Sequence, residues 1–145
     1  MNYDKRAIRA LIIIAIVIAL VGASWYWLHQ PYTPPAAIQT AQQFVDYLQQ
    51  ENYKAAFELT VKQGYVGMSP QALSDIRQRH CLASQYAYSS PPQSNGNRLR
   101  RWWNGNPIEQ TQLNLEFTGH CLLSVRLKPQ TDGTWKVYYF ASHAG

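Results

Sequence analysis

Two cysteines, each directly preceded by a histidine, are the residues with the clearest capacity for chemistry: His80-Cys81 and His120-Cys121. Two cysteines and two histidines could bind zinc, but neighbouring residues point to opposite faces of a strand and diverge by about 100° on a helix. Two unpaired thiols are a further alternative. An even cysteine count in an exported chain favours a disulfide, which would stabilise the fold by about 4 kcal/mol in the chain-entropy model. We predict a Cys81–Cys121 disulfide and no metal site.

Carboxylates that could act as a general acid or base are few. Asp46, Asp75 and Glu116 fall on expected polar faces, and Asp132 lies in an expected turn. Glu109 is the exception, because it shares strand parity with a downstream apolar alternation and could point inward near a pocket mouth. The alternative, usual for a glutamate at a strand end, is that its side chain is solvated. We expect no catalytic residue and no cofactor. If the chain is an enzyme, only Glu109 and the histidines are candidates.

A basic and aromatic stretch is the densest candidate contact surface. It contains Arg98, Arg100, Arg101, Trp102 and Trp103. Arginine and tryptophan often dominate buried interfaces, which favours contact with a protein partner. The alternative is an edge strand whose charges deter pairing with other sheets while the tryptophans pack into the core. Both interpretations stay open on sequence alone.

An uncharged stretch at residues 10–28 is predicted to form a transmembrane helix of about 28 Å, close to the thickness of a bilayer's hydrocarbon core. It ends in the aromatic residues Trp25, Tyr26 and Trp27, which suit the membrane interface. The alternative is a signal peptide cleaved after Ala23. Cleavage would leave an aromatic cluster at the terminus of a soluble protein, so we favour a retained signal-anchor.

The flanking charges predict the orientation. Residues 1–9 carry basic side chains and are expected to be a cytoplasmic tip, residues 29–35 a proline-rich tether, and residues 36–145 an exported domain. We expect a bacterial inner membrane with the domain in the periplasm; the exterior of a Gram-positive cell is the alternative, and the sequence leaves both open. The net charge of +5 is too small and the compartment unsuitable for nucleic-acid binding. The short tether keeps the domain near the bilayer, so its expected partners are lipid and other membrane proteins.

Periodicity within the exported domain predicts an α+β fold of three helices and about four antiparallel strands, with one face of the sheet covered by helices. Helices are expected at 36–50, from Tyr53 through Val61 to Gly64, and from Ser69-Pro70 to His80. Alternation predicts strands around 86–88, 113–117, 121–127 and 135–141.

This order of elements resembles the NTF2-like superfamily, a curved sheet wrapped around helices. The resemblance rests on Ala41-x-x-Phe44-x-x-x-Leu48, on Asn52-Tyr-x-Ala-Ala-Phe57, on Ser69-Pro-Gln-Ala-Leu73 and on a closing strand Asp132-Gly-Thr-Trp-Lys-Val137. The layout of a short tip, one membrane helix and an exported domain resembles VirB8-like components of type IV secretion systems, with a shorter tip and a smaller domain. The superfamily contains enzymes, binders and assembly subunits, so the fold does not choose a function.

We therefore expect a non-enzymatic accessory or assembly subunit of a larger inner-membrane complex. A second hypothesis is a module that binds a small apolar ligand in a pocket formed by Tyr47, Tyr86, Tyr88 and Tyr139. A third is an isomerase or hydrolase.

Overall fold

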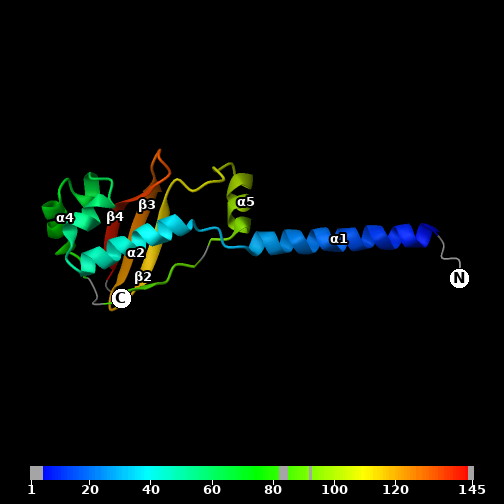
Figure 1. Cartoon of the computed structure of the whole chain (residues 1–145), viewed down its shortest axis with the longest axis horizontal. Coiled ribbons are helices and arrows are strands. Elements are labelled where there is room, and N and C mark those ends of the chain that lie inside the picture. The colour runs from blue at the N-terminus through cyan, green and yellow to red at the C-terminus, as the bar shows by residue number, and fades with distance from the viewer. Residues whose placement is uncertain (1–4, 82–84, 92, 144–145) are drawn as a thin grey trace. The chain divides into compact units, whose positions relative to one another are not determined.

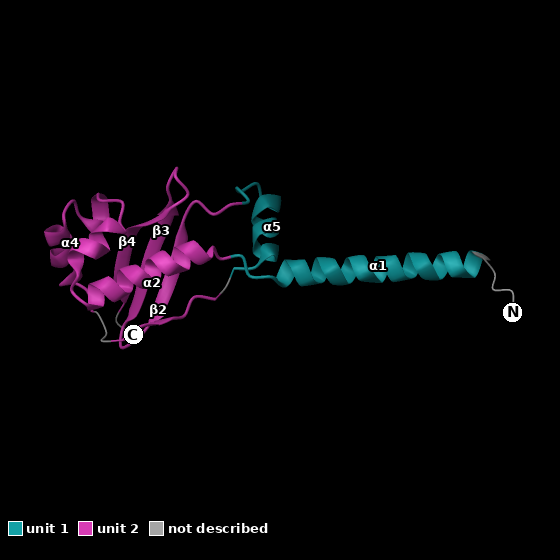
Figure 2. Ribbon diagram, viewed as in Figure 1, with its two compact units in different colours: residues 1–32, 92–108 teal, residues 33–91, 109–145 magenta. Residues whose placement is uncertain are grey.

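The structure is a computed structural model that describes residues 5–81, 85–91 and 93–143. It divides into two compact units, coloured separately in Figure 2. Unit 1 contains residues 1–32 and 92–108, and unit 2 contains residues 33–91 and 109–145. Residues 92–108, which the sequence assigns to the middle of the exported domain, thus belong with the N-terminal helix.

Unit 1 contains two helices, α1 (Lys5–His29) and α5 (Asn95–Trp103). Within α1, residues Arg6–His29 are long and apolar enough to cross a membrane, and none of the apolar window is buried. This confirms the predicted apolar helix by length and composition. A retained anchor and a cleaved signal peptide would both contain such a helix.

The helices of unit 2 are α2 (Pro35–Gln49), α3 (Tyr53–Glu58), the short 3-10 helix η1 (Gly64–Val66) and α4 (Pro70–Arg77). The predicted start of α4 is confirmed: the Ser69 hydroxyl accepts the Ala72 N–H at 3.1 Å, and proline occupies the first turn. The predicted C-terminal end of α4 is wrong, because the helix stops before His80.

The second helix is shorter than predicted. It ends at Glu58 because the chain then leaves the helix to pair with the last strand of the sheet. The Val61 N–H donates to the Val137 carbonyl, and the Val137 N–H donates to the Leu59 carbonyl, each at 2.9 Å. Val61 therefore extends the sheet edge, and Gly64 begins η1 instead of ending α3.

One antiparallel sheet contains β1 (Ala87–Tyr88), β2 (Leu113–Thr118), β3 (Leu122–Pro129) and β4 (Trp135–His143) in that spatial order. The predicted α+β class and four antiparallel strands are confirmed, whereas the NTF2-like cone remains a prediction. Alternation explains the register: Leu115 lies opposite Val125, which lies opposite Phe140, and all three are buried. Cys121 immediately precedes β3.

Helix α2 covers one face of this sheet, as Figure 1 shows. Its Phe44 ring packs edge-on against Phe140 with 5.5 Å between the ring centroids. The core cluster around this pair consists of residues of unit 2 alone. Its largest fully buried aliphatic side chains are Leu48, Leu73, Leu123, Leu127, Val45, Val66, Val125 and Val137.

The predicted disulfide is confirmed. Cys81 and Cys121 are bonded, with 6.2 Å between their Cα atoms and 40 residues between them in sequence. The Cys81 N–H also donates to the Ser142 hydroxyl at 2.9 Å. The chain following α4 is thereby fixed to the end of the sheet.

The edge-strand interpretation of the basic aromatic stretch is wrong. Residues 95–103 form helix α5, and Trp102 and Trp103 are 56% and 81% exposed instead of packed in the core. A helical spacing runs through this segment. One face of the helix contains the residues at i, i+4, i+7 and i+8, which are Asn95, Leu99, Trp102 and Trp103.

Candidate functional site

The structure brings together two groups of residues that lie far apart in the sequence, the aromatic end of α1 and the start of α5. The Asn95 side-chain amide donates to the Trp27 carbonyl at 3.1 Å, and the Asn95 N–H donates to the Gln30 carbonyl at 3.0 Å. Asn95 is only 8% exposed. A single buried asparagine therefore attaches the first turn of α5 to the end of α1.

Backbone pairing continues this attachment along the predicted tether. The Tyr32 N–H donates to the Gln93 carbonyl, and Pro31 forms an antiparallel bridge with Ser94. The first residues after α1 are consequently fixed within unit 1, and α2 begins soon afterwards at Pro35.

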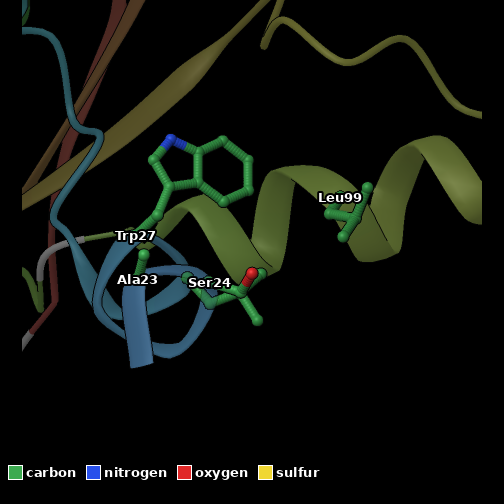
Figure 3. A pocket seen from close by; sticks show the side chains of 5 residues that line it. Ala23, Ser24, Trp27 and Leu99 are labelled. Atoms are coloured by element: carbon green, nitrogen blue, oxygen red, sulfur yellow. The ribbon is translucent and has the colours of Figure 1, made fainter. Parts of the chain in front are cut away.

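A shallow groove lies between the two helices. Its volume is about 420 Å³, and the residues lining it are mostly apolar: Ala23, Ser24, Trp27, Leu28 and Leu99. Figure 3 shows Leu99 on α5 and the other labelled side chains on α1. The helices approach closely at Gly96, where an added Cβ would lie 3.3 Å from the Leu28 carbonyl oxygen. The groove therefore adjoins a point at which the backbones of the two helices pack closely.

The apolar face of α5 extends past its contact with α1. Asn95 and Leu99 face α1, whereas Trp102 and Trp103 continue the same stripe with more than half of their surfaces exposed. The three aromatic residues at the end of α1, Trp25, Tyr26 and Trp27, are also exposed, by 67%, 67% and 51%. Unit 1 thus presents exposed aromatic side chains at one end of its apolar helix.

Three arginines accompany this aromatic surface. The Arg98 guanidinium stacks 3.2 Å from the centre of the Tyr32 ring. Arg101 Nη2 donates to the Ile108 carbonyl at 2.7 Å, and Arg100 Nη2 donates to the Asn97 side-chain oxygen at 3.2 Å. Residues 5–32 and 93–108, which are the described part of unit 1, include no aspartate or glutamate. Among the described residues of unit 1, the charge of α5 therefore has no acidic complement.

A second cluster lies on the face of the sheet opposite α2. Arg126 and Tyr139 are register partners, and the guanidinium lies 4.9 Å from the ring centroid. The Tyr65 ring packs edge-on against Tyr139 at 5.5 Å and is 73% exposed. Beside them, the Tyr138 hydroxyl donates to the Gln112 side-chain oxygen at 2.9 Å at the rim of a hollow of about 310 Å³.

The four tyrosines predicted to share a pocket are distributed over the unit. Tyr86 and Tyr88 line a hollow of about 180 Å³ whose other residues are Gln42, Val45, Asp46 and Phe117. Burial raises the pKa of Tyr88, an effect partly opposed by its hydrogen bond with Ser90. Tyr139 lies instead with Arg126, and Tyr47 packs against the core.

The candidate catalytic residues are not brought together. Glu109 is exposed and precedes β2, which agrees with the solvated alternative and not with an inward orientation. His80 lies beside Phe140, with ring centroids 5.1 Å apart, and its Nδ1 accepts the Ser142 N–H at 3.4 Å. Burial, followed by the charges of Arg79 and His143, lowers the pKa of His80. Across the described residues, no group of three or more His, Cys, Asp or Glu side chains could hold a metal ion.

Comparisons with protein-family models, with curated proteins and with solved structures found no match to this chain. The contacts of unit 1 include residues that the sequence reasoning missed, namely Asn95, Gly96 and Leu99. The spacing of Asn95 and Leu99 with the tryptophans is a helical signal that could have identified two of them.

Proposed function

We propose that this chain is a single-pass protein of a bacterial inner membrane, with its N-terminus in the cytoplasm and unit 2 in the periplasm. It acts without catalysis, as an accessory or assembly subunit of a larger membrane complex. The observation that carries the proposal is the Arg126–Tyr139–Tyr65 cluster on the sheet face opposite α2.

This cluster has the chemistry of a protein contact. Arginine and tyrosine are enriched among the residues that dominate binding energy, and a guanidinium over an aromatic ring is itself a favourable contact. Tyr139 holds both neighbours, with Arg126 over its ring and Tyr65 at its edge. The side chains therefore lose less conformational freedom when a partner binds.

The two other functional hypotheses receive less support. A hollow of about 180 Å³ at Tyr86 and Tyr88 is smaller than the roughly 300 Å³ at which ligand pockets begin, and it includes the charged Asp46. An isomerase or hydrolase would need a protonatable residue in a pocket, whereas Glu109 is exposed and no histidine lines the three hollows described above. A VirB8-like arrangement of anchor and domain remains the structural expectation for the assembly subunit.

Purification of the full chain from native membranes tests the proposal. Arg126→Glu and Tyr139→Ala should each reduce the amount of co-purifying membrane protein, because they remove the charge and the ring of the cluster. Lys54→Glu is the matched control, since this exposed lysine lies on α3 and is not part of the cluster. Undiminished co-purification by both cluster variants would contradict the proposal. A monomer that carries a bound apolar compound would favour the ligand-binding hypothesis.

A further inference from the structure

We propose that α5 is an interfacial helix that binds anionic phospholipid in the leaflet around the C-terminal end of α1. Its tryptophan face lies at the boundary between headgroups and acyl chains, and its arginines contact lipid phosphate. This inference rests on the membrane anchoring in the proposed function and assigns a ligand to a different surface.

The depth of α5 follows from its contacts with α1. The apolar segment Arg6–His29 has 24 residues, a length of about 36 Å, whereas the hydrocarbon core is about 30 Å thick. The ends of α1 therefore reach the headgroup regions. Helix α5 contacts the last two turns, through the groove at Ala23–Leu28 and the bond from Asn95 to Trp27. It consequently lies at the level of the interfacial aromatic residues.

The orientation of α5 relative to α1 also fits a position at the membrane interface. Figures 1 and 3 show it crossing the end of α1 instead of running alongside it. With α1 along the membrane normal, α5 lies near the membrane plane, as interfacial amphipathic helices do.

Helix α5 has apolar side chains that suit the acyl chains of a lipid and charged side chains that suit its headgroup. Trp102 and Trp103 are large, apolar and exposed, and each carries an N–H that the headgroup region can hydrogen-bond. The adjoining groove of about 420 Å³ is mostly apolar and can hold part of an acyl chain.

The charges of α5 select an anionic headgroup. Arginine binds phosphate with two parallel hydrogen bonds, and the described residues of unit 1 provide no carboxylate to compete for it. The Arg100 side chain is exposed, so its guanidinium is accessible to a phosphate, although its Nη2 also donates to the Asn97 side-chain oxygen. Charge complementarity therefore favours lipid over a second, equally basic copy of this unit.

Fluorescence quenching of the full chain in liposomes tests the inference. Of the five tryptophans, Trp25, Trp27 and Trp135 are replaced with phenylalanine, which leaves Trp102 and Trp103 as reporters. The probes are phosphatidylcholine and phosphatidylglycerol brominated in their acyl chains. We expect quenching by both, with the phosphatidylglycerol quenching more strongly. Arg100→Gln with Arg101→Gln should reduce this preference about fivefold for each arginine lost.

A parallel measurement does not depend on the tryptophan substitutions. The chain with all five tryptophans is purified from liposomes in mild detergent, and the bound phosphatidylglycerol is quantified by mass spectrometry. Arg100→Gln with Arg101→Gln should lower the amount bound, and Arg79→Gln, an exposed arginine of unit 2, should not.

The possible outcomes distinguish failure of this inference from failure of the proposed function. Flotation of the chain with the liposomes after alkaline extraction establishes anchoring, and failure to float would overturn the anchor itself. An anchored chain whose Trp102 and Trp103 are not quenched would overturn the interfacial helix alone. Equal quenching by both lipids would overturn the headgroup preference. Cross-linking of α5 to a membrane protein in place of lipid would assign the surface to a protein partner.

Discussion

Unit 2 buries its apolar side chains, whereas unit 1 displays them. Phe44 and Phe140 are 0% and 2% exposed, but Trp102 and Trp103 are 56% and 81% exposed and the apolar side chains of α1 are uncovered. Water favours the first arrangement and penalises the second. The difference agrees with the proposed membrane anchoring, in which unit 2 faces water and unit 1 faces a lipid bilayer and its interface.

The two units are also stabilised by different interactions. Unit 2 is stabilised by a contiguous core and a disulfide. The two helices of unit 1 are joined by hydrogen bonds from Asn95, by the bridge of Pro31 with Ser94 and by the close approach at Gly96. Removing apolar volume or the cross-link should therefore affect unit 2, and removing hydrogen bonds should affect unit 1.

Loss of the disulfide should have the largest effect. Cys81→Ser with Cys121→Ser removes a cross-link across 40 residues and should lower the free energy of unfolding of unit 2 by about 4 kcal/mol. Urea unfolding with hydrogen exchange read in β3 measures this change. Exchange in α5 serves as the internal control and should not change. Equal loss of protection in both segments would contradict the independence of the two units.

Truncation of the core should come next. Leu48 is fully buried, so Leu48→Ala should destabilise unit 2 by about 3 kcal/mol through lost transfer free energy and a residual cavity. Gln43→Ala on the exposed face of α2 is the matched control and should change stability little. Urea midpoints of the two variants measure the difference, and similar midpoints would show that α2 does not close the core.

The parts of the fold that were predictable are those in which local pattern and tertiary contact agree. Leu113, Leu115 and Phe117 alternate with polar residues, and the strand buries them accordingly. Ser69 and Pro70 start α4 through bonds made within one turn. The disulfide followed from cysteine count and compartment. The strand and the helix start need no knowledge of a distant segment, and the disulfide needed only the predicted compartment.

The mispredicted parts depend on partners far away in sequence. Helix α5 contains a glycine and two asparagines, which disfavour a helix, and its Asn95 is satisfied by Trp27, which lies 68 residues earlier. Val61 leaves its predicted helix because β4 offers an unpaired edge. The residue types of the surface formed by α1 and α5 can therefore be recognised in the sequence. Their assembly at the end of α1 cannot be predicted from it.

Removal of the buried amide should affect unit 1 alone. Asn95→Ala deletes the bond to the Trp27 carbonyl and should weaken the attachment of α5 by about 1 kcal/mol. Hydrogen exchange of α5 in liposomes should rise about fivefold, with β3 unchanged. Asn106→Ala, an exposed asparagine beyond the helix, is the control. Unchanged exchange in α5 would mean that lipid holds the helix without this bond.

The smallest effect should be a pH dependence confined to unit 2. Burial beside Phe140 lowers the pKa of His80 below its ordinary value of 6.5, so the unfolded chain takes up this proton first as the pH falls. Stability should therefore be full above pH 6.5 and decrease as the pH falls toward the lowered pKa. His80→Gln should remove this decrease, whereas His120→Gln, at an exposed position, should retain it. Urea midpoints of unit 2 between pH 5 and 8 measure the slope. The same slope in the His80→Gln variant would assign it to other groups. A reversed slope would mean that the folded unit favours the charged imidazole.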